Sequence, residues 1–204
     1  MHSQAPDVGA PSLLEALRTG TALLHVALEK RLPFFSDDLN ADWYQRLLQA
    51  YYGFYQPMEA ALYDCDLIPE GFDRVLRVKT PTLLNDLYAL GLSETTVKAL
   101  PRCTELPTLE TPAACLGALY VLEGATLGGQ VLRREMAQRL GIDARNGGAF
   151  LDIYGAETGR RWKDFLDYLG RMPLDAHARQ HAVDAARSTF SCFEQWLDSQ
   201  EVLL

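Results

Sequence analysis

The chain has 204 residues, of which 48% are hydrophobic, and it carries a formal net charge of −8 at pH 7. A chain of this length forms one domain or a fused pair and can bury a sizeable core. Its acidic balance argues against nucleic acid or an anionic membrane as the main partner.

The cysteines and the N-terminus indicate a cytoplasmic protein. Four cysteines are scattered along the chain without a CxxC pair, which favours a reducing compartment over a disulfide framework or a zinc site. Residues 1–11 lack the basic and apolar regions of a signal peptide, so we expect a flexible lead-in before one helical domain over residues 12–204. No apolar run predicts a membrane-spanning helix.

Two helices are predicted in the first third of the chain. The first begins at Ser12, which has capping-box spacing to Glu15, and ends at Pro33. The second begins near residue 40, and Pro57 predicts a kink or break within it before the pattern stops near residue 70. An aromatic run on this second helix is expected in the core: Trp43, Tyr44, Tyr51, Tyr52, Phe54 and Tyr55.

The remaining pattern is also helical. A short helix is predicted over residues 80–92, and a long one begins at Thr111-Pro112 and stops at Gly141. Residues 145–159 are predicted as a loop, followed by helices over 160–169 and 175–197. Since no segment alternates apolar and polar residues at strand length, the predicted fold class is all-α.

His25 lies at the edge of an apolar stripe on the first helix. Arg18 precedes it by seven residues and Glu29 follows it by four, so all three lie on the same side. The ordinary interpretation is a half-buried histidine with a simple hydrogen bond. The functional interpretation is a neutral imidazole that binds a metal, with a carboxylate or water orienting the ring.

Three glycines interrupt the long helix between Tyr120 and Gln130, and each costs about 1 kcal/mol relative to alanine in a helix interior. Gly124 and Gly128 are four residues apart, so they open a strip of bare backbone on one face. Close packing against another helix explains such a strip, and so does a planar ligand. Gly129 adds to the local freedom to bend.

Together, the stretches LRTGTALLHVALE and YVLEGATLGGQVL resemble the proximal and distal helices of haem oxygenases, and the resemblance runs from about Ser12 to Leu197. Within that family the chain is most similar to the bacterial, biliverdin-producing type and to the branch associated with bacterial phytochromes. The resemblance implies a single all-α domain in which haem is sandwiched between the proximal helix and a kinked distal helix.

The resemblance also implies roles for individual residues. His25 is the axial ligand of the haem iron, with Glu29 beside it. Gly124 and Gly128 lie over the distal face and act in catalysis, and Gly129 belongs to the same haem-binding wall. The haem propionates are bound by basic residues and a tyrosine: Arg18, Tyr120 and Lys163, with Arg160 and Arg161 as substitutes.

The implied activity is oxidative cleavage of haem to biliverdin, carbon monoxide and ferrous iron. Haem is substrate and cofactor, O2 is the oxidant, and electrons come from a reductase or a ferredoxin-type donor. A bilin-accepting photoreceptor is a further implied partner. Ala125 stands where animal haem oxygenases carry an aspartate that organises water at the iron-bound oxygen, so the proton needs another water network.

Two other classes of function stay open. One is a non-catalytic haem-binding or haem-sensing module, for which Ala125 is the argument. The other is a thiaminase-like or di-iron enzyme on the same fold, although Cys115 lies well before the glycines and ligands for two irons are too few. His177 and His181 could pair on a metal, but a surface helix is the more ordinary interpretation. Phe190 and Phe193 fit either the core or a pocket wall.

Overall fold

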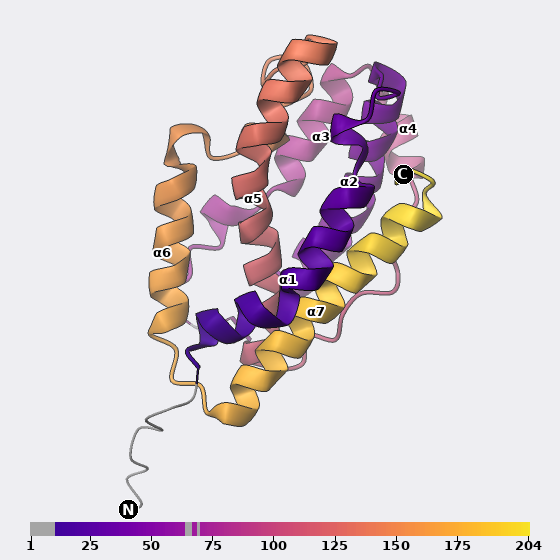
Figure 1. Ribbon diagram of the computed structural model, residues 1–204. Helices are drawn as coiled ribbons and strands as arrows, with labels where there is room; N and C mark the ends of the chain where they lie inside the picture. The colour runs from indigo at the N-terminus through magenta and orange to yellow at the C-terminus, as the bar shows by residue number, and fades with distance from the viewer. Residues whose placement is uncertain (1–10, 64–66, 69) are drawn as a thin grey trace, which may run out of the picture.

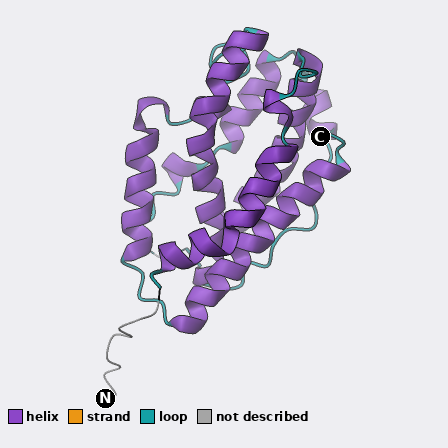
Figure 2. Cartoon of the chain, in the orientation of Figure 1, coloured by secondary structure: helices purple, strands orange, loops and turns teal. Residues whose placement is uncertain are grey.

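The computed structural model describes residues 11–63, 67–68 and 70–204, so most of the predicted lead-in and Cys65 lie outside the described residues. Regular structure in these ranges is helical throughout, as predicted (Figure 2). The α-helices are α1 (Leu13–Arg31), α2 (Ala41–Tyr63), α3 (Thr80–Ala89), α4 (Glu94–Ala99), α5 (Pro112–Leu140), α6 (Thr158–Gly170) and α7 (Ala176–Ser199). Short 3-10 helices stand between them: η1 (Pro33–Phe35), η2 (Val75–Arg77), η3 (Phe150–Asp152) and η4 (Gly155–Glu157).

The predicted capping signals lie where the helices begin and end. Ser12 and Glu15 form a complete capping box at the start of α1. The Thr111 side chain accepts a hydrogen bond from the Ala114 N–H at the start of α5. Gly141 ends α5 in the left-handed conformation, with φ of 66°.

Pro57 does not break the second helix, so of the predicted kink or break the structure contradicts the break. It lies inside α2, which continues to Tyr63. A proline cannot donate to the carbonyl four residues earlier, which here belongs to Gly53. The N–H of Cys103 donates to that carbonyl instead, at 2.9 Å, so the loop after α4 satisfies the acceptor that Pro57 leaves free.

The structure also contains short helices that the sequence pattern did not predict, and one helix that begins earlier than predicted. α4 was not predicted, because six residues are too few to show helical periodicity. The Ser93 side chain caps it by accepting from the Thr96 N–H. The predicted loop over 145–159 contains η3 and η4, and α6 begins at Thr158, two residues before the expected start.

α5 is the central helix of the fold. It packs against α7, α6 and η3, while α1 packs against α7 and α6, and α2 packs against α3 and α7 (Figure 1). A Cβ atom on Gly117 would lie 2.0 Å from the Ala182 carbonyl oxygen, so this glycine permits the close approach of α5 and α7. The aromatic run on α2 is mostly buried, as predicted.

By length and composition α5 is apolar enough to cross a membrane, although the sequence pattern predicted no membrane-spanning helix. α5 has no long uninterrupted run of large apolar residues, because glycine and alanine are mixed with them. Half of the most apolar segment of α5 is buried inside the protein, as in the core helix of a globular fold.

Candidate functional site

The exposed side of α1 presents the predicted proximal residues together. The His25 side chain is 55% exposed, and its Nδ1 lies 3.4 Å from the Glu29 carboxylate, one helical turn further on. The imidazole also meets the Phe190 ring of α7 edge to face, with 5.9 Å between the ring centroids. A carboxylate partner on Nδ1 leaves Nε2 as the nitrogen available to a ligand. A fully buried core histidine does not fit this exposure, whereas both a half-buried histidine with an ordinary partner and a ligand of a metal do.

Phe190 and Phe193 have different surroundings, which the sequence could not separate. Phe190 touches His25, whereas Phe193 packs among the aromatic rings of α2, at 5.1 Å from Tyr51 and 4.8 Å from Phe54 between centroids. Phe190 is buried and contacts His25, so it is a candidate wall of the site, whereas Phe193 is partly buried against the aromatic residues of α2.

The three glycines in the middle of α5, Gly124, Gly128 and Gly129, have three different environments. A Cβ atom on Gly124 would lie 3.7 Å from the Trp162 indole of α6, in ordinary van der Waals contact. A Cβ atom on Gly128 would meet nothing within 4 Å. A Cβ atom on Gly129 would lie 2.4 Å from the Leu151 carbonyl oxygen, because η3 packs directly on this side of the helix.

Gly129 therefore does not belong to the haem-binding wall implied by the resemblance. It is buried, and the approach of η3 to α5 accounts for the absence of a side chain. Successive residues of a helix point about 100° apart, so Gly128 and Gly129 cannot share one face. The bare strip consists of Gly124 and Gly128.

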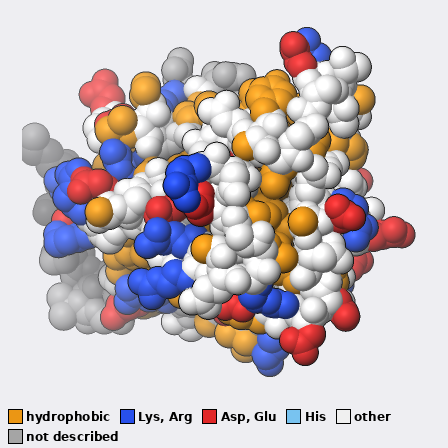
Figure 3. All heavy atoms as spheres, turned by 90° about the horizontal axis from the view of Figure 1, so that it is seen from above, with side chains coloured by type: hydrophobic (Ala, Val, Ile, Leu, Met, Phe, Trp, Pro, Cys, Tyr) orange, Lys and Arg blue, Asp and Glu red, His pale blue; other side chains and the backbone are white. Residues whose placement is uncertain are grey.

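Apolar side chains beside Gly128 are exposed. Leu127 is 40% exposed and lies three residues after Gly124, and Val131 is 57% exposed and lies three residues after Gly128, so each flanks the bare strip of α5. In the view from above, hydrophobic side chains gather in a furrow between ridges of the surface (Figure 3). Exposed apolar residues that adjoin each other on one face commonly mark a ligand or partner surface.

Contacts at Tyr120 set the relative level of α1 and α5. Burial raises the pKa of the Tyr120 phenol, while the charge of Arg18 and a hydrogen bond with Thr21 act in the opposite direction. His25 is four residues after Thr21, and Gly124 is four residues after Tyr120. Both helices run upward in Figure 1, and four residues rise about 6 Å along either helix, so His25 and Gly124 lie at a similar level.

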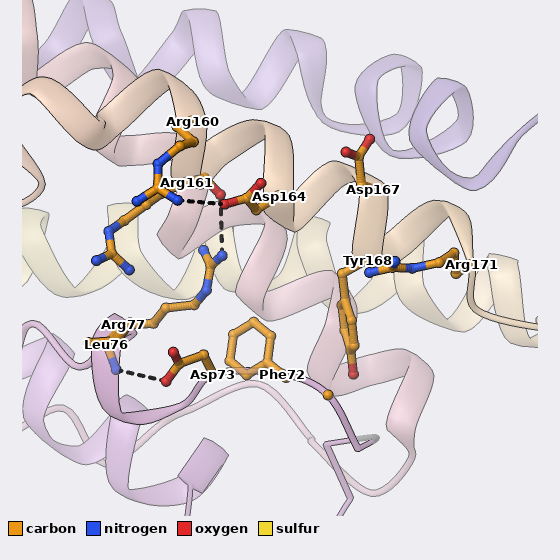
Figure 4. Close-up of a pocket in the computed structure, with 11 residues that line it drawn as sticks. Phe72, Asp73, Leu76, Arg77, Arg160, Arg161, Asp164, Asp167, Tyr168 and Arg171 are labelled. Atoms are coloured by element: carbon orange, nitrogen blue, oxygen red, sulfur yellow. Dashed lines mark hydrogen bonds and ion pairs between the residues drawn. The ribbon is translucent and has the colours of Figure 1, made fainter.

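The basic residues of α6 do not act as one group. Arg160 pairs with Glu157 and lines a cavity of about 390 Å³ between α6 and residues 71–77, together with Arg161 (Figure 4). Lys163 is not among the residues that line this cavity, and it pairs with Asp167 on its own helix. Trp162 faces α5, and Arg160 is two residues away on roughly the opposite side of α6. The structure thus separates Arg160 from the α1–α5 face, and of the three predicted residues on α6 only Lys163 does not line this cavity and stays a candidate there.

A buried ionic network next to Gly124 was not predicted. The Glu123 carboxylate is 1% exposed and binds the guanidinium of Arg77, the ammonium of Lys79 at 2.6 Å and the Tyr154 hydroxyl at 3.0 Å. Burial and the Glu123 charge raise the pKa of the Tyr154 phenol. The sequence signal for this network is a single glutamate directly after the apolar stretch 113–122, because a carboxylate buried there needs charged or hydrogen-bonding partners.

The other predicted alternatives find little support in the structure. His177 and His181 have ring centroids 4.1 Å apart, but the described residues contain no group of three or more metal-binding side chains. Cys115 is fully buried in the core, whereas a reactive nucleophilic cysteine is partly exposed. Neither a di-iron centre nor a cysteine nucleophile is indicated.

Comparisons with known proteins agree with one another. The sequence profile of the family described as "Heme oxygenase" matches residues 11–199. A heme oxygenase of Xanthomonas campestris pv. campestris (strain 8004) is 28% identical over 165 residues, which are 79% of this chain and 93% of that protein.

Solved structures share the fold. The NO- and CO-bound heme oxygenase of Neisseria meningitidis superposes with a TM-score of 0.75 at 22% identity, covering 94% of this chain and 92% of that one. Heme oxygenase-1 of the cyanobacterium Synechocystis, in complex with heme, gives a TM-score of 0.72 at 17% identity, covering 94% and 93%.

Proposed function

This chain belongs to the haem oxygenase family, and on that premise we propose that it binds its haem between α1 and α5, with His25 as the axial ligand of the iron. The family makes the protein an oxidoreductase that cleaves haem to biliverdin, carbon monoxide and ferrous iron. The observation that carries the assignment of His25 is its exposed imidazole, at the level of a helix strip without side chains.

The described residues fit a flat ligand with a metal at its centre. At Gly128 the space that a side chain would fill is open, and the adjoining Leu127 and Val131 are exposed apolar residues. The Glu29 carboxylate lies 3.4 Å from Nδ1 of His25, which leaves Nε2 as the nitrogen proposed to bind the iron. Bound haem supplies the redox chemistry, and the protein supplies binding and orientation.

Three residues are proposed to bind the haem propionates: Arg18, Tyr120 and Lys163. The charge of Arg18 on α1 acts on the pKa of the Tyr120 phenol of α5, against the effect of burial, which supports a role for both at one end of the site. Lys163 adds a charge from α6, and its Asp167 partner is exposed, so this pair is weakly held and can be exchanged for a propionate. In the view from above, Lys and Arg side chains gather on the side of the molecule where α6 lies (Figure 3).

The remaining proposals follow from the chemistry of the reaction. O2 and an external electron donor, such as a reductase or a ferredoxin, are required, and a bilin-accepting photoreceptor in the cytoplasm is the proposed acceptor of the product. Nucleic acid is not a proposed partner. Ala125 is exposed on α5 and offers no polar group, so proton delivery has to use other groups and water.

A binding experiment with hemin tests the ligand. Wild type should give a sharp Soret band characteristic of histidine ligation, and His25→Ala should lose or change it. His181→Ala is the matched control, because this histidine lies on α7 beside His177 and should leave the band as it is. A Soret band that is the same in wild type and in His25→Ala would remove His25 from the site.

Turnover separates the oxygenase from a haem-binding module of the same fold. With a reductant in air, the wild-type complex should lose its Soret band and develop the broad visible absorbance of a bilin. A complex that keeps its Soret band through repeated reduction in air would favour the module.

A further inference from the structure

Trp162 is the nearest side chain to the bare strip of α5. Its six-membered ring lies over Gly124, where Cη2 and Cζ3 would be 3.7 and 3.9 Å from a Cβ atom. Because a Cβ atom leans toward the N-terminus of its helix, the indole covers the turn between Tyr120 and Gly124. Gly128, one turn further on, has nothing within 4 Å of its Cβ position. The strip is therefore closed at one end and open at the other.

Trp162 is held in place by aromatic rings. Its ring centroid lies 5.7 Å from that of Tyr120 on α5 and 5.7 Å from that of Phe165 on α6. Among the described residues no hydrogen bond to the indole N–H is found, so contacts of the ring fix its position. Burial raises the pKa of the Tyr120 phenol, and Arg18 and Thr21 of α1 act against this increase, so groups of three helices lie near this end of the site.

We propose that Trp162 is a specificity-determining residue of the haem site, whose indole closes the Tyr120 end of the glycine strip and limits the haem ring to one in-plane orientation over Gly128. This inference rests on the proposed function. The edge of a porphyrin that meets the indole cannot slide toward Tyr120. The in-plane orientation then decides which meso carbon faces the reactive side, so Trp162 also affects which biliverdin isomer forms.

The test uses the full chain with hemin, in wild type, Trp162→Ala, Trp162→Phe and Trp43→Phe. Trp162→Phe keeps an aromatic ring at the position and guards against a folding defect of the alanine variant. Trp43→Phe is the matched control, since Trp43 donates to the Val202 carbonyl near the C-terminus. Proton NMR of the ferric, cyanide-bound complex reports the ratio of in-plane orientations through the shifted haem methyl signals, without turnover.

We expect Trp162→Ala to retain the Soret band and to change the ratio of methyl signal sets by about two- to tenfold, as for the loss of one aromatic contact. The ratio of biliverdin isomers should change in the same direction, whereas both phenylalanine variants should stay close to wild type.

An alanine variant with a normal Soret band and the wild-type ratio would overturn the role of Trp162. Loss of the Soret band in both Trp162 variants would also overturn it, since Trp162 would then be needed for binding rather than orientation. A wild-type protein without a Soret band would instead overturn the proposed function.

Discussion

Single glycines in α5 have opposite roles, although the sequence presents them as one motif. Gly128 faces open space, whereas Gly129 is needed because η3 occupies the position of its side chain. The difference of one residue turns the helix by about 100°, which moves a residue from the ligand face to a packed interface.

A pair of alanine substitutions tests this difference. Gly128→Ala should stabilise the haem-free protein by about 1 kcal/mol, because alanine is the better helix former and meets no clash. Gly129→Ala should destabilise it by about 1–3 kcal/mol, because its methyl group would be forced against the Leu151 carbonyl. Urea denaturation followed by circular dichroism at both positions gives the comparison. Equal effects of the two substitutions would contradict the assignment of the faces.

At the scale of elements, α5 is fixed to the rest of the fold by charges as well as by apolar packing. Glu123 joins α5 to Arg77 of η2 and to Lys79 at the start of α3. Glu59 of α2 accepts from the backbone N–H groups of Lys79 and Thr80, and so caps α3. These contacts hold the helix that carries Gly124 against three neighbouring elements.

Glu123→Gln should lower the free energy of unfolding by about 3–5 kcal/mol, because it leaves two buried cations without their anion. Glu94→Gln is the matched control, since its ion pair with Lys98 is exposed and such pairs contribute about 0–1 kcal/mol. Chemical denaturation measures both. If Glu123→Gln cost no more than the control, the network would not anchor α5.

At the scale of the whole molecule, the interior is rich in tyrosine. Burial raises the pKa of seven phenols above the ordinary value of 10.0. The increase is largest for five of them: Tyr44, Tyr51, Tyr55, Tyr63 and Tyr154. The folded state binds these protons more tightly than the unfolded chain does. Their contribution to stability is therefore complete below pH 10 and is lost as the pH rises above it.

We predict cooperative alkaline unfolding. Each raised phenol lowers the free energy of unfolding by about 1.4 kcal/mol per pH unit above 10, so five of them remove about 7 kcal/mol per unit, comparable to the stability of a whole domain. Tyrosinate absorbance and loss of helical circular dichroism should coincide within about two pH units of 10. Tyr51→Phe should reduce by about one the number of protons that unfolding releases above pH 10, so the free energy of unfolding should fall less steeply with pH. Tyrosinates that form while the helices persist would contradict the prediction.

The sequence by itself determined the features that depend on neighbours along the chain. Capping residues placed the starts of α1 and α5, Gly141 placed the end of α5, and the spacing of His25 and Glu29 placed both on one side of α1. These signals act within one or two helical turns, so they can be read without knowing how the chain folds.

Only the tertiary structure decided which groups far apart in the sequence meet. It brought the Cys103 N–H to the Gly53 carbonyl, which accommodates Pro57, and it supplied the partners of Glu123. It also separated Arg160 from the α1–α5 face. It also placed Trp162 over Gly124 and left Gly128 open. Each depends on the packing of one helix against another, which is fixed by the shape of the whole core and leaves no periodic trace along the chain.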